Sequence, residues 1–194
     1  MLSVEINDVK GFMGKLLASD TFDQYLILEA VITKANTFTI DGRLNEEYLS
    51  DLNEGVNSAD GSGSETSEEE KRRALTGEGS YGAACFGTGD SSGFPRLQSW
   101  GNVRQFCYEL VKGKTLPVYM KVVLQLSRQD TEKLLARSGA VLSISDVAGL
   151  YLNISYDRKG LRCVTGTSLL TFTLDKSIEH EWDETIKGRL AEYE

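Results

Sequence analysis

Residues 150–157 read LYLNISYD and give the strongest secondary-structure signal in the chain. Every even position in this run is apolar or aromatic, and a repeat of two residues is typical of a strand that buries one face. The turn-forming residues DRKG occupy positions 157–160, and residues 161–165 (LRCVT) resume an extended pattern. This order of strand, turn and strand predicts an antiparallel hairpin.

Other strand-like runs lie on both sides of this hairpin. Residues 25–33 (YLILEAVIT) predict a strand buried on both faces, and residues 118–126 place every second side chain on one apolar face. A turn at 166–168 and a strand at 169–174 are expected to complete a three-stranded meander. The expected strands begin at Leu2, Tyr25, Phe38, Val118, Leu150, Leu161 and Leu169.

Two ten-residue segments predict related helices. Residues 8–17 (DVKGFMGKLL) and 102–111 (NVRQFCYELV) each place apolar residues at i, i+3, i+4, i+7 and i+8, with a cation beside the first of them. We expect both apolar stripes to lie in the core. Ser127 resembles the start of a capping box and opens a further helix that ends at Gly139. A last helix is expected to bury Ile178, Trp182, Ile186 and Leu190.

These elements predict an α+β fold, a single domain over residues 1–194 with a largely antiparallel sheet and packed helices. The segment FTID at 38–41 is echoed by FTLD at 172–175, and each leads into a predicted helix. With the matching decapeptides, this raises the hypothesis of an internal duplication of strand-helix-strand units. The alternative is that strand-to-helix junctions and amphipathic helices resemble one another for physical reasons alone.

Residues 51–96 differ in composition from the rest of the chain. They contain nine of the 19 glycines, many serines and the charged run EEEKRR at 68–73. Such a segment cannot bury enough apolar surface to offset the entropy lost on ordering. We therefore expect a flexible acidic Gly/Ser-rich insertion here, with one short helix at 68–75. A further short helix is expected before it, at 45–49.

The charge of the chain limits its partners. The net charge is −8 at pH 7, which argues against a general nucleic-acid coat and against binding to anionic membranes. Nine acidic and four basic residues lie in the insertion, so the body of the protein is only mildly acidic and can carry a local basic surface. The first residues lack a basic and apolar signal sequence, and no run of 18 apolar residues occurs. We expect a cytoplasmic protein with no membrane partner.

The three cysteines, Cys85, Cys107 and Cys163, are odd in number and widely spaced. This spacing fits neither a disulfide framework nor a C-x-x-C metal site. We expect Cys107 and Cys163 to be small core residues.

Histidine and glycine motifs give little support for catalysis. His180, the only histidine, and Glu184 would lie on one turn of the last helix, where they could begin a metal site or belong to a solvated acidic face. The segment GEGSYG at 77–82 matches G-x-G-x-x-G but lacks the flanking strand and helix of a dinucleotide site. We expect no cofactor and no metal centre.

Paired carboxylates are the remaining catalytic hypothesis. Asp41, Asp157 and Asp175 lie at predicted strand ends or turns, and two acids brought together could hydrolyse a glycosidic bond. Turn-forming and helix-capping roles explain the same residues. Whether the protein is an enzyme is uncertain from the sequence, which leans toward a non-enzymatic role.

The candidate binding residues are cations that lie off the apolar stripes of the two matched helices. If these helices lie side by side on one sheet, their basic side chains form a strip that could meet phosphates. Ordinary solubilising residues are the alternative interpretation. The five cations are Lys10, Lys15, Arg104, Lys112 and Lys114.

Four groups of residues are characteristic when taken together: NDVK at 7–10 with Phe12, NTFTIDGR at 36–43, GLYLN at 149–153, and TGTS at 165–168 with FTLDK at 172–176. They resemble a family of uncharacterised clostridial (Firmicutes) proteins that is known only as a domain of unknown function. The resemblance covers residues 1–50 and 97–185, and it implies that family members have a much shorter connection in place of residues 51–96. It implies no catalytic residues, because the family has no established activity.

A weak architectural analogy links the chain to DNA sliding clamps, whose repeated units surround DNA with helices while their sheets face outward. The predicted basic helix faces are similar to that pattern, whereas the helices after Ser127 and at the C-terminus depart from it. The leading hypothesis is a non-enzymatic binding or scaffold protein of the bacterial cytoplasm, with an unidentified protein or ligand partner. A nucleic-acid-contacting, clamp-like protein and a carboxylate-dependent hydrolase are the alternatives.

Overall fold

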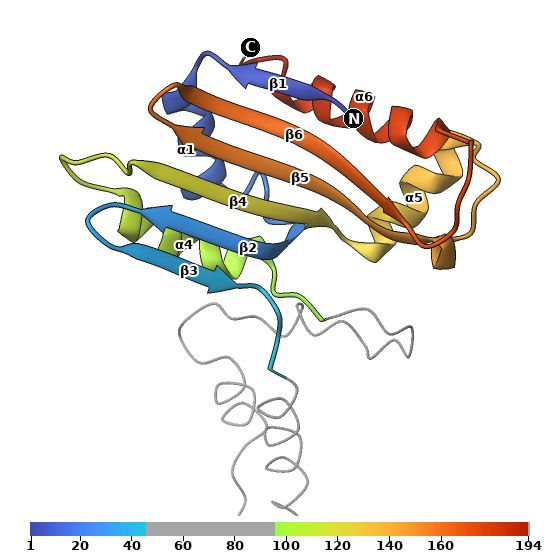
Figure 1. Ribbon diagram of the computed structural model, residues 1–194, viewed down its shortest axis with the longest axis horizontal. Helices are drawn as coiled ribbons and strands as arrows, with labels where there is room; N and C mark the ends of the chain where they lie inside the picture. Colours follow the sequence, from blue (N-terminus) through green and yellow to red (C-terminus); the bar gives the residue numbers. More distant parts are fainter. Residues whose placement is uncertain (46–95, 194) are drawn as a thin grey trace, which may run out of the picture. The chain divides into compact units, whose positions relative to one another are not determined.

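The computed structural model describes residues 1–45 and 96–193. Contacts divide the chain into two compact units, Met1–Gly42 with Leu97–Glu194, and Arg43–Arg96. The fold described below is that of the first unit (Figure 1). Several sequence predictions lie outside the described residues. They are the helix at 45–49 except for Asn45, the helix at 68–75, the GEGSYG motif, and nearly all of the predicted insertion.

The predicted α+β class is confirmed. Six strands, four α-helices and one short 3₁₀ helix occur in the described part of the chain. In chain order they are β1 (Ser3–Ile6), α1 (Val9–Ala18), β2 (Tyr25–Thr33), β3 (Thr37–Asp41), α4 (Trp100–Val111), β4 (Tyr119–Leu126), α5 (Arg128–Ser138), η2 (Ile144–Asp146), β5 (Val147–Asp157), β6 (Gly160–Leu169) and α6 (Ser177–Leu190).

All six strands form one sheet in the order β1-β6-β5-β4-β2-β3, and every pair of neighbours is antiparallel (Figure 1). The predicted hairpin lies near its centre, where Tyr156 is opposite Leu161 and Asp157 is opposite Gly160. Gly160 has φ +146°, a conformation that favours glycine and closes the turn. The run LYLNISYD therefore forms most of β5, a strand as the sequence predicted.

The predicted third strand of the meander is wrong. β6 continues without a turn to Leu169, and Gly166 lies opposite Tyr151 within the ladder. The glycine and small polar residues at 166–168 stay extended because they pair with residues 149–151 of β5. Residues 170–176 form a loop instead, so FTLD at 172–175 lies outside the sheet while FTID at 38–41 lies in β3.

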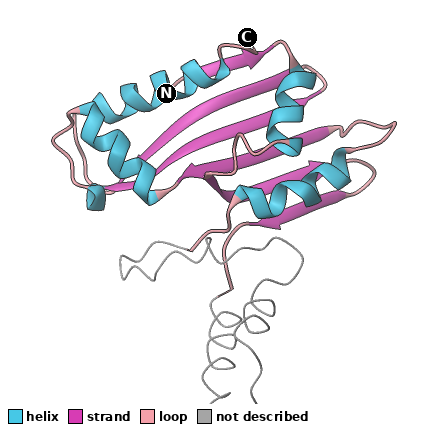
Figure 2. Cartoon of the chain, turned by 180° about the vertical axis from the view of Figure 1, so that it is seen from behind, coloured by secondary structure: helices cyan, strands magenta, loops and turns pink. Residues whose placement is uncertain are grey.

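The helices cover one face of the sheet, as seen from behind in Figure 2, and no helix in the described ranges lies on the other face. The inward-facing positions of the strands are apolar and buried, whereas the open face carries polar and half-buried side chains. For this reason β2 is buried on one face only, not on both as predicted. On the open face, Lys121 pairs with Glu29 at 2.7 Å and Arg162 pairs with Glu5 at 3.0 Å.

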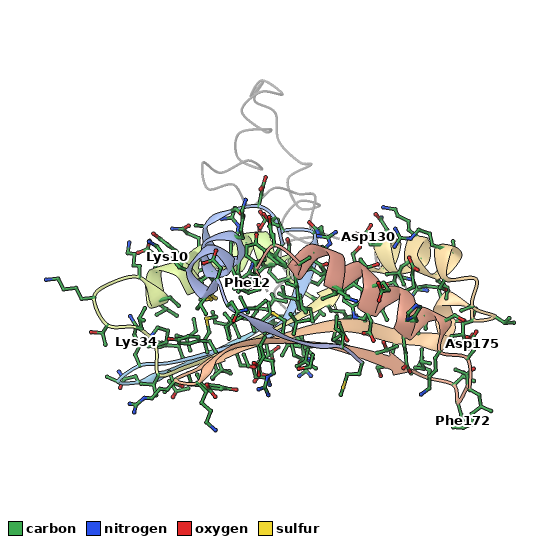
Figure 3. The ribbon with its side chains drawn as sticks, turned by 90° about the horizontal axis from the view of Figure 1, so that it is seen from above. Lys10, Phe12, Lys34, Asp130, Phe172 and Asp175 are labelled. Carbon is green, nitrogen blue, oxygen red and sulfur yellow. The ribbon has the colours of Figure 1, made fainter. Side chains whose placement is uncertain are left out.

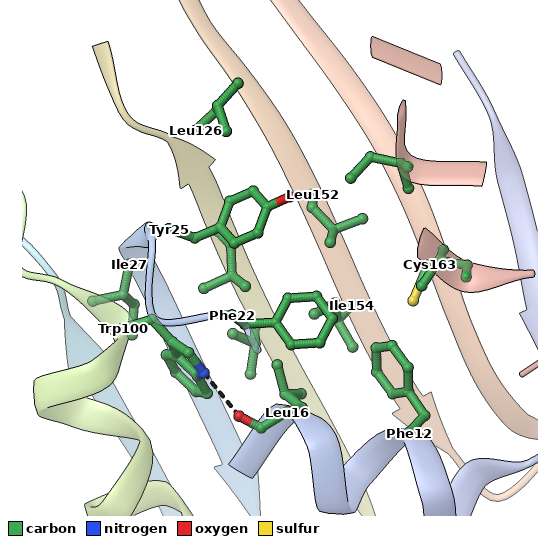
Figure 4. Close-up of a cluster of buried hydrophobic side chains, with 14 of the residues drawn as sticks. Phe12, Leu16, Phe22, Tyr25, Ile27, Trp100, Leu126, Leu152, Ile154 and Cys163 are labelled. Carbon is green, nitrogen blue, oxygen red and sulfur yellow. Dashed lines mark hydrogen bonds between the residues drawn. The ribbon is translucent and has the colours of Figure 1, made fainter. Parts of the chain in front are cut away.

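The two helices predicted from the matching decapeptides, α1 and α4, contact each other on the covered face. Asp8 caps α1 by accepting a hydrogen bond from the backbone N–H of Gly11 at 2.9 Å. The last turns of α1 meet the first turn of α4, where the Trp100 indole N–H donates to the Leu16 carbonyl at 2.9 Å (Figure 4). Figure 2 shows α1 directed toward α4 and not parallel to it, so their adjacency gives little support to an internal duplication.

The apolar stripes of these helices are largely in the core, as predicted. Phe12, Leu16, Val103 and Cys107 are buried, but Phe106 is 54% exposed, so its predicted place in the core is wrong. Phe106 and the preceding polar residue Gln105 are both exposed on α4.

Of the remaining helices, α5 begins and ends as predicted, and α6 buries the predicted residues. The Ser127 hydroxyl caps α5 by accepting a hydrogen bond from the N–H of Asp130, and Gly139 ends the helix with φ +65°. α6 buries the predicted residues on its inner side. They are Ile178, Trp182, Ile186 and Leu190.

Candidate functional site

The five predicted cations do not form one free basic strip. Arg104 lies beside Asp23, and its guanidinium donates to both carboxylate oxygens at 2.7 and 3.2 Å. A bidentate pair of this kind uses the geometry that would otherwise bind a phosphate. Asp23 precedes β2, so this pair ties α4 to the loop that follows α1 and serves as a structural contact.

Lys112 and Lys114 follow α4 at one end of the sheet. Lys112 forms an ion pair with Glu109, and its ammonium lies 6.0 Å from the centre of the Tyr108 ring. Lys34, in the turn between β2 and β3, donates to the Lys112 carbonyl at 3.4 Å. This contact brings Lys34, which the sequence did not single out, next to Lys112, one of the predicted cations.

Lys10 and Lys15 are exposed on α1. Figure 3 shows Lys10 in the helix layer and Lys34 at the level of the sheet. The predicted residues therefore divide into two exposed lysines on α1, one paired arginine, and two lysines at the end of α4.

Basic side chains are also found on three strand connections that lie at one end of the sheet. The turn between β5 and β6 contributes Arg158 and Lys159, which are exposed, and the ladder places this turn at the same end of the sheet as the start of β4 and the β2–β3 turn. Strands lie about 5 Å apart, so the connections are spread over roughly 15–20 Å. We call this surface the cationic end: Lys34, Lys112, Lys114, Arg158 and Lys159, with the exposed apolar residues Leu116 and Val118.

The three candidate carboxylates are far apart. Asp157 ends β5 at the cationic end, whereas Asp175 bonds to Val141 beyond the opposite end of that strand. The length of β5 separates them by on the order of 30 Å. Asp41 lies at the end of β3, opposite Glu29 in the ladder. None of these pairs has the spacing of the two acids of a glycosidase.

Other predicted chemical groups are also isolated. His180 and Glu184 are both exposed on α6. Cys107 and Cys163 are in the core as predicted, and burial raises the pKa of each thiol to about 12, which keeps them protonated and unreactive at neutral pH. Within residues 1–45 and 96–193, no three histidine, cysteine or acidic side chains are grouped closely enough to hold a metal ion. Cys85 lies outside these residues.

An exposed apolar surface that sequence reasoning missed lies at the end of the sheet opposite the cationic end. We call it the apolar end. Its side chains come from the loop after β6 and from the loop between α5 and η2, and they are between 66% and 95% exposed. Figure 3 shows Phe172 projecting on the loop after β6. The four residues are Val141, Leu170, Phe172 and Leu174.

Asp175 and Asp146 hold the apolar end in a defined conformation. Asp175 accepts hydrogen bonds from the hydroxyl and N–H of Ser177 at 2.6 and 2.9 Å and from the N–H of Val141 at 3.2 Å, which joins the two loops. Asp146 accepts from Thr171 at 3.1 Å, and its carbonyl accepts from the N–H of Leu170 at 2.8 Å. The loop is therefore anchored on both sides of Phe172.

Both carboxylates are stabilised as anions. The hydroxyl of Ser177 is the main cause that lowers the pKa of Asp175, followed by the N–H groups of Ser177 and Val141. The hydroxyl and N–H of Ser143, and then Thr171, lower the pKa of Asp146. The apolar end therefore carries two negative charges at neutral pH.

The alternation LTFTL at 170–174 was the sequence signal that could have identified this surface. It predicted a strand, because one face of the segment is apolar. In the structure, no strand in the described part of the chain pairs with residues 170–174, and their apolar side chains face solvent.

No helix in the described residues combines the length and apolar character that crossing a membrane requires. Comparison with known proteins adds one relationship. The model of a family of unknown function, DUF5721, matches residues 15–67 and 78–194, and the chain therefore belongs to that family. No curated protein and no solved structure matches the chain.

The family match bears on two earlier expectations. It confirms the resemblance to an uncharacterised domain family. It also includes residues 51–67 and 78–96, so most of the segment expected to be a departure from the family lies within the matched ranges, and only residues 68–77 interrupt it.

Proposed function

We propose that this protein is a non-enzymatic binding or scaffold protein, and that the apolar end is its contact surface for a protein partner. The observation that carries the proposal is the exposure of Val141, Leu170, Phe172 and Leu174 on loops that hydrogen bonds hold in place. Several exposed apolar side chains on ordered, neighbouring loops are typical of protein interfaces.

The energy available at this surface is substantial. Burying one large apolar side chain contributes about 1.5–3 kcal/mol, so covering all four contributes roughly 6–12 kcal/mol before the entropic cost of association. The loop is already anchored by Asp146 and Asp175, and this preorganisation reduces the cost of ordering it on binding. Phe172 is the natural anchor residue, because large aromatic side chains dominate interface energetics.

A site-specific photocrosslinker at position 172 of the full chain tests the proposal. We expect a discrete crosslinked adduct, lost when Leu170 and Leu174 are both replaced by serine. A crosslinker at Lys187, exposed on α6, is the matched control and should give no such adduct. Equal, diffuse crosslinking from both positions would count against a contact surface at the apolar end.

Nucleic-acid contact through the helices is a weaker second proposal. Arg104 is committed to Asp23 and Lys112 to Glu109, which leaves Lys10, Lys15 and Lys114 as its main support. Salt-sensitive DNA binding that a Lys10, Lys15 and Lys114 triple alanine variant reduces would favour it. The analogy to a sliding clamp belongs to this proposal.

The carboxylate-dependent hydrolase is less well supported, because its candidate acids lie far apart. Replacing Asp41, Asp157 and Asp175 together should leave any hydrolytic activity unchanged. We also propose, on the sequence alone, that the protein is clostridial in origin and located in the cytoplasm.

A further inference from the structure

We propose that the partner of the apolar end is the cationic end of a second copy of this chain, so that copies associate head to tail. The inference rests on the proposed function, since it names the occupant of the same surface. It predicts that the protein associates with itself, which the proposed function alone does not predict.

The two surfaces lie at opposite ends of one sheet. β4 starts at Tyr119, beside the cationic end, and ends at Leu126; β5 runs antiparallel to it and starts at Val147, beside the apolar end. A single copy therefore cannot bring its own two ends together. Contact between them requires another molecule.

The charges of the two ends are complementary. The apolar end includes the carboxylates of Asp146 and Asp175, and Glu179 follows in the first turn of α6. Lys176 is the single basic residue in the loop 170–176. The cationic end carries five basic residues against Glu109 and Asp157, while the acids Asp8 and Glu192 lie beside the end of β1 at the same end of the sheet. Two copies of a chain with net charge −8 repel each other over most of their surfaces. The carboxylates of the apolar end and the basic residues of the cationic end attract each other instead.

The cationic end also offers apolar surface. Leu116 is 64% exposed in the connection between α4 and β4, and Val118 beside it is exposed as well. The N–H of Val118 donates to the carbonyl of Thr33 at 2.8 Å, so this connection is held against the β2–β3 turn. Phe172 and Leu174 of one copy thus have an ordered apolar counterpart among the lysines of the next.

Other occupants explain less of the structure. An anionic membrane would be repelled by the carboxylates beside the apolar end. A nucleic acid would neutralise the cationic end but would leave Phe172 and Leu174 in water. A second copy covers both surfaces with one contact.

The symmetry of this contact sets the form of the assembly. Different surfaces meet, so the interface is heterologous, and each copy keeps one unused end after pairing. The assembly therefore grows past two copies, as an open chain or a closed ring, and does not stop at a symmetric dimer.

The test uses two serine variants of the full chain, each blocked at one end. Phe172→Ser with Leu174→Ser blocks the apolar end, and Lys114→Ser with Leu116→Ser blocks the cationic end. All four side chains are exposed, so circular dichroism should show an unchanged fold. Lys187→Ser, on α6, is the control variant.

Sedimentation velocity from low to high micromolar concentration gives the readout. We expect wild-type and Lys187→Ser protein to grow past two copies at about 20 mM salt and to dissociate at about 0.5 M salt, where charges are screened beyond a few ångströms. Each blocked variant alone should stay monomeric. An equal mixture of the two should form a pair and nothing larger, because only one interface is then intact.

Three results would overturn the inference. They are a wild-type chain that stays monomeric at low salt, a blocked variant that associates as the wild type does, and a monomer whose cationic end binds a single-stranded oligonucleotide instead. If the chain is monomeric while position 172 crosslinks to a different protein, this inference fails and the proposed function stands. If position 172 gives no specific adduct at all, both fail.

Discussion

The segments FTID at 38–41 and FTLD at 172–175 are nearly identical in sequence and differ completely in their surroundings. The first forms most of β3, where Ile40 lies opposite Ala30 and packs against the core. The second is a loop outside the sheet, where Phe172 and Leu174 are among the most exposed apolar side chains. A strand pattern in the sequence thus became a strand only where β2 offered it a free edge.

The residues that follow each segment explain part of the difference. Gly42 follows the first and lies against the bulge of β2, and its N–H donates to the carbonyl of Leu28 at 3.0 Å. Lys176 follows the second segment, whose Asp175 accepts hydrogen bonds from the N–H groups of Ser177 and Val141. The first segment is fixed to the sheet at its end, while the second is fixed to neighbouring loops.

Gly42→Ala should have the largest effect on this comparison. A Cβ at this position would lie 1.8 Å from the carbonyl oxygen of Ile27, which is backbone and cannot move aside cheaply. We expect a loss of about 3 kcal/mol in the free energy of unfolding, as for severe overpacking, and a melting temperature lower by roughly 6–12 °C. Thermal unfolding followed by circular dichroism measures it.

Gly14→Ala is the matched control for that variant. A Cβ at Gly14 would meet no atom within 4 Å, and the residue lies inside α1. The same chemical change should therefore stabilise the protein by about 0.5–1 kcal/mol. If both variants changed stability in the same direction, the close approach at Gly42 would not be the cause.

Ile40→Ala and Leu174→Ala compare equivalent positions of the two segments. Ile40 packs against the core, so its truncation should cost about 1–2 kcal/mol, less than for a fully buried isoleucine. Leu174 is exposed, and its truncation should change stability by less than about 0.5 kcal/mol. Denaturant unfolding of both variants measures the difference, and equal losses would show that the loop is packed in solution.

Asp175→Asn should have the smallest effect at neutral pH and a characteristic pH dependence. The pKa of Asp175 is lowered in the folded chain, mainly by the Ser177 hydroxyl, so the carboxylate stabilises the fold above the unfolded pKa of about 3.9. That contribution is lost as pH falls through the lower folded pKa. The stability difference between wild type and variant should therefore shrink below about pH 4, as measured by urea unfolding across that range. A difference that stayed constant down to low pH would contradict the anchoring role of the carboxylate.

The limits of prediction can be seen in particular residues. Asp8, Ser127 and Gly139 were read correctly as helix boundaries, because capping depends on a few neighbouring residues. The binding residues were harder to predict from the sequence. Arg104 looked like a free cation until the fold placed Asp23, 81 positions earlier in the chain, beside it.

The sequence by itself determined the central hairpin, the four helices and the α+β class, since hydrophobic periodicity and capping are local properties. Only the tertiary structure decided which of two like segments became β3 and which remained an exposed loop. It also decided that the apolar end and the cationic end lie at opposite ends of one sheet. Both depend on strand pairing between distant residues, because a strand needs a neighbour to complete its hydrogen bonds and the sequence does not show which edge is free.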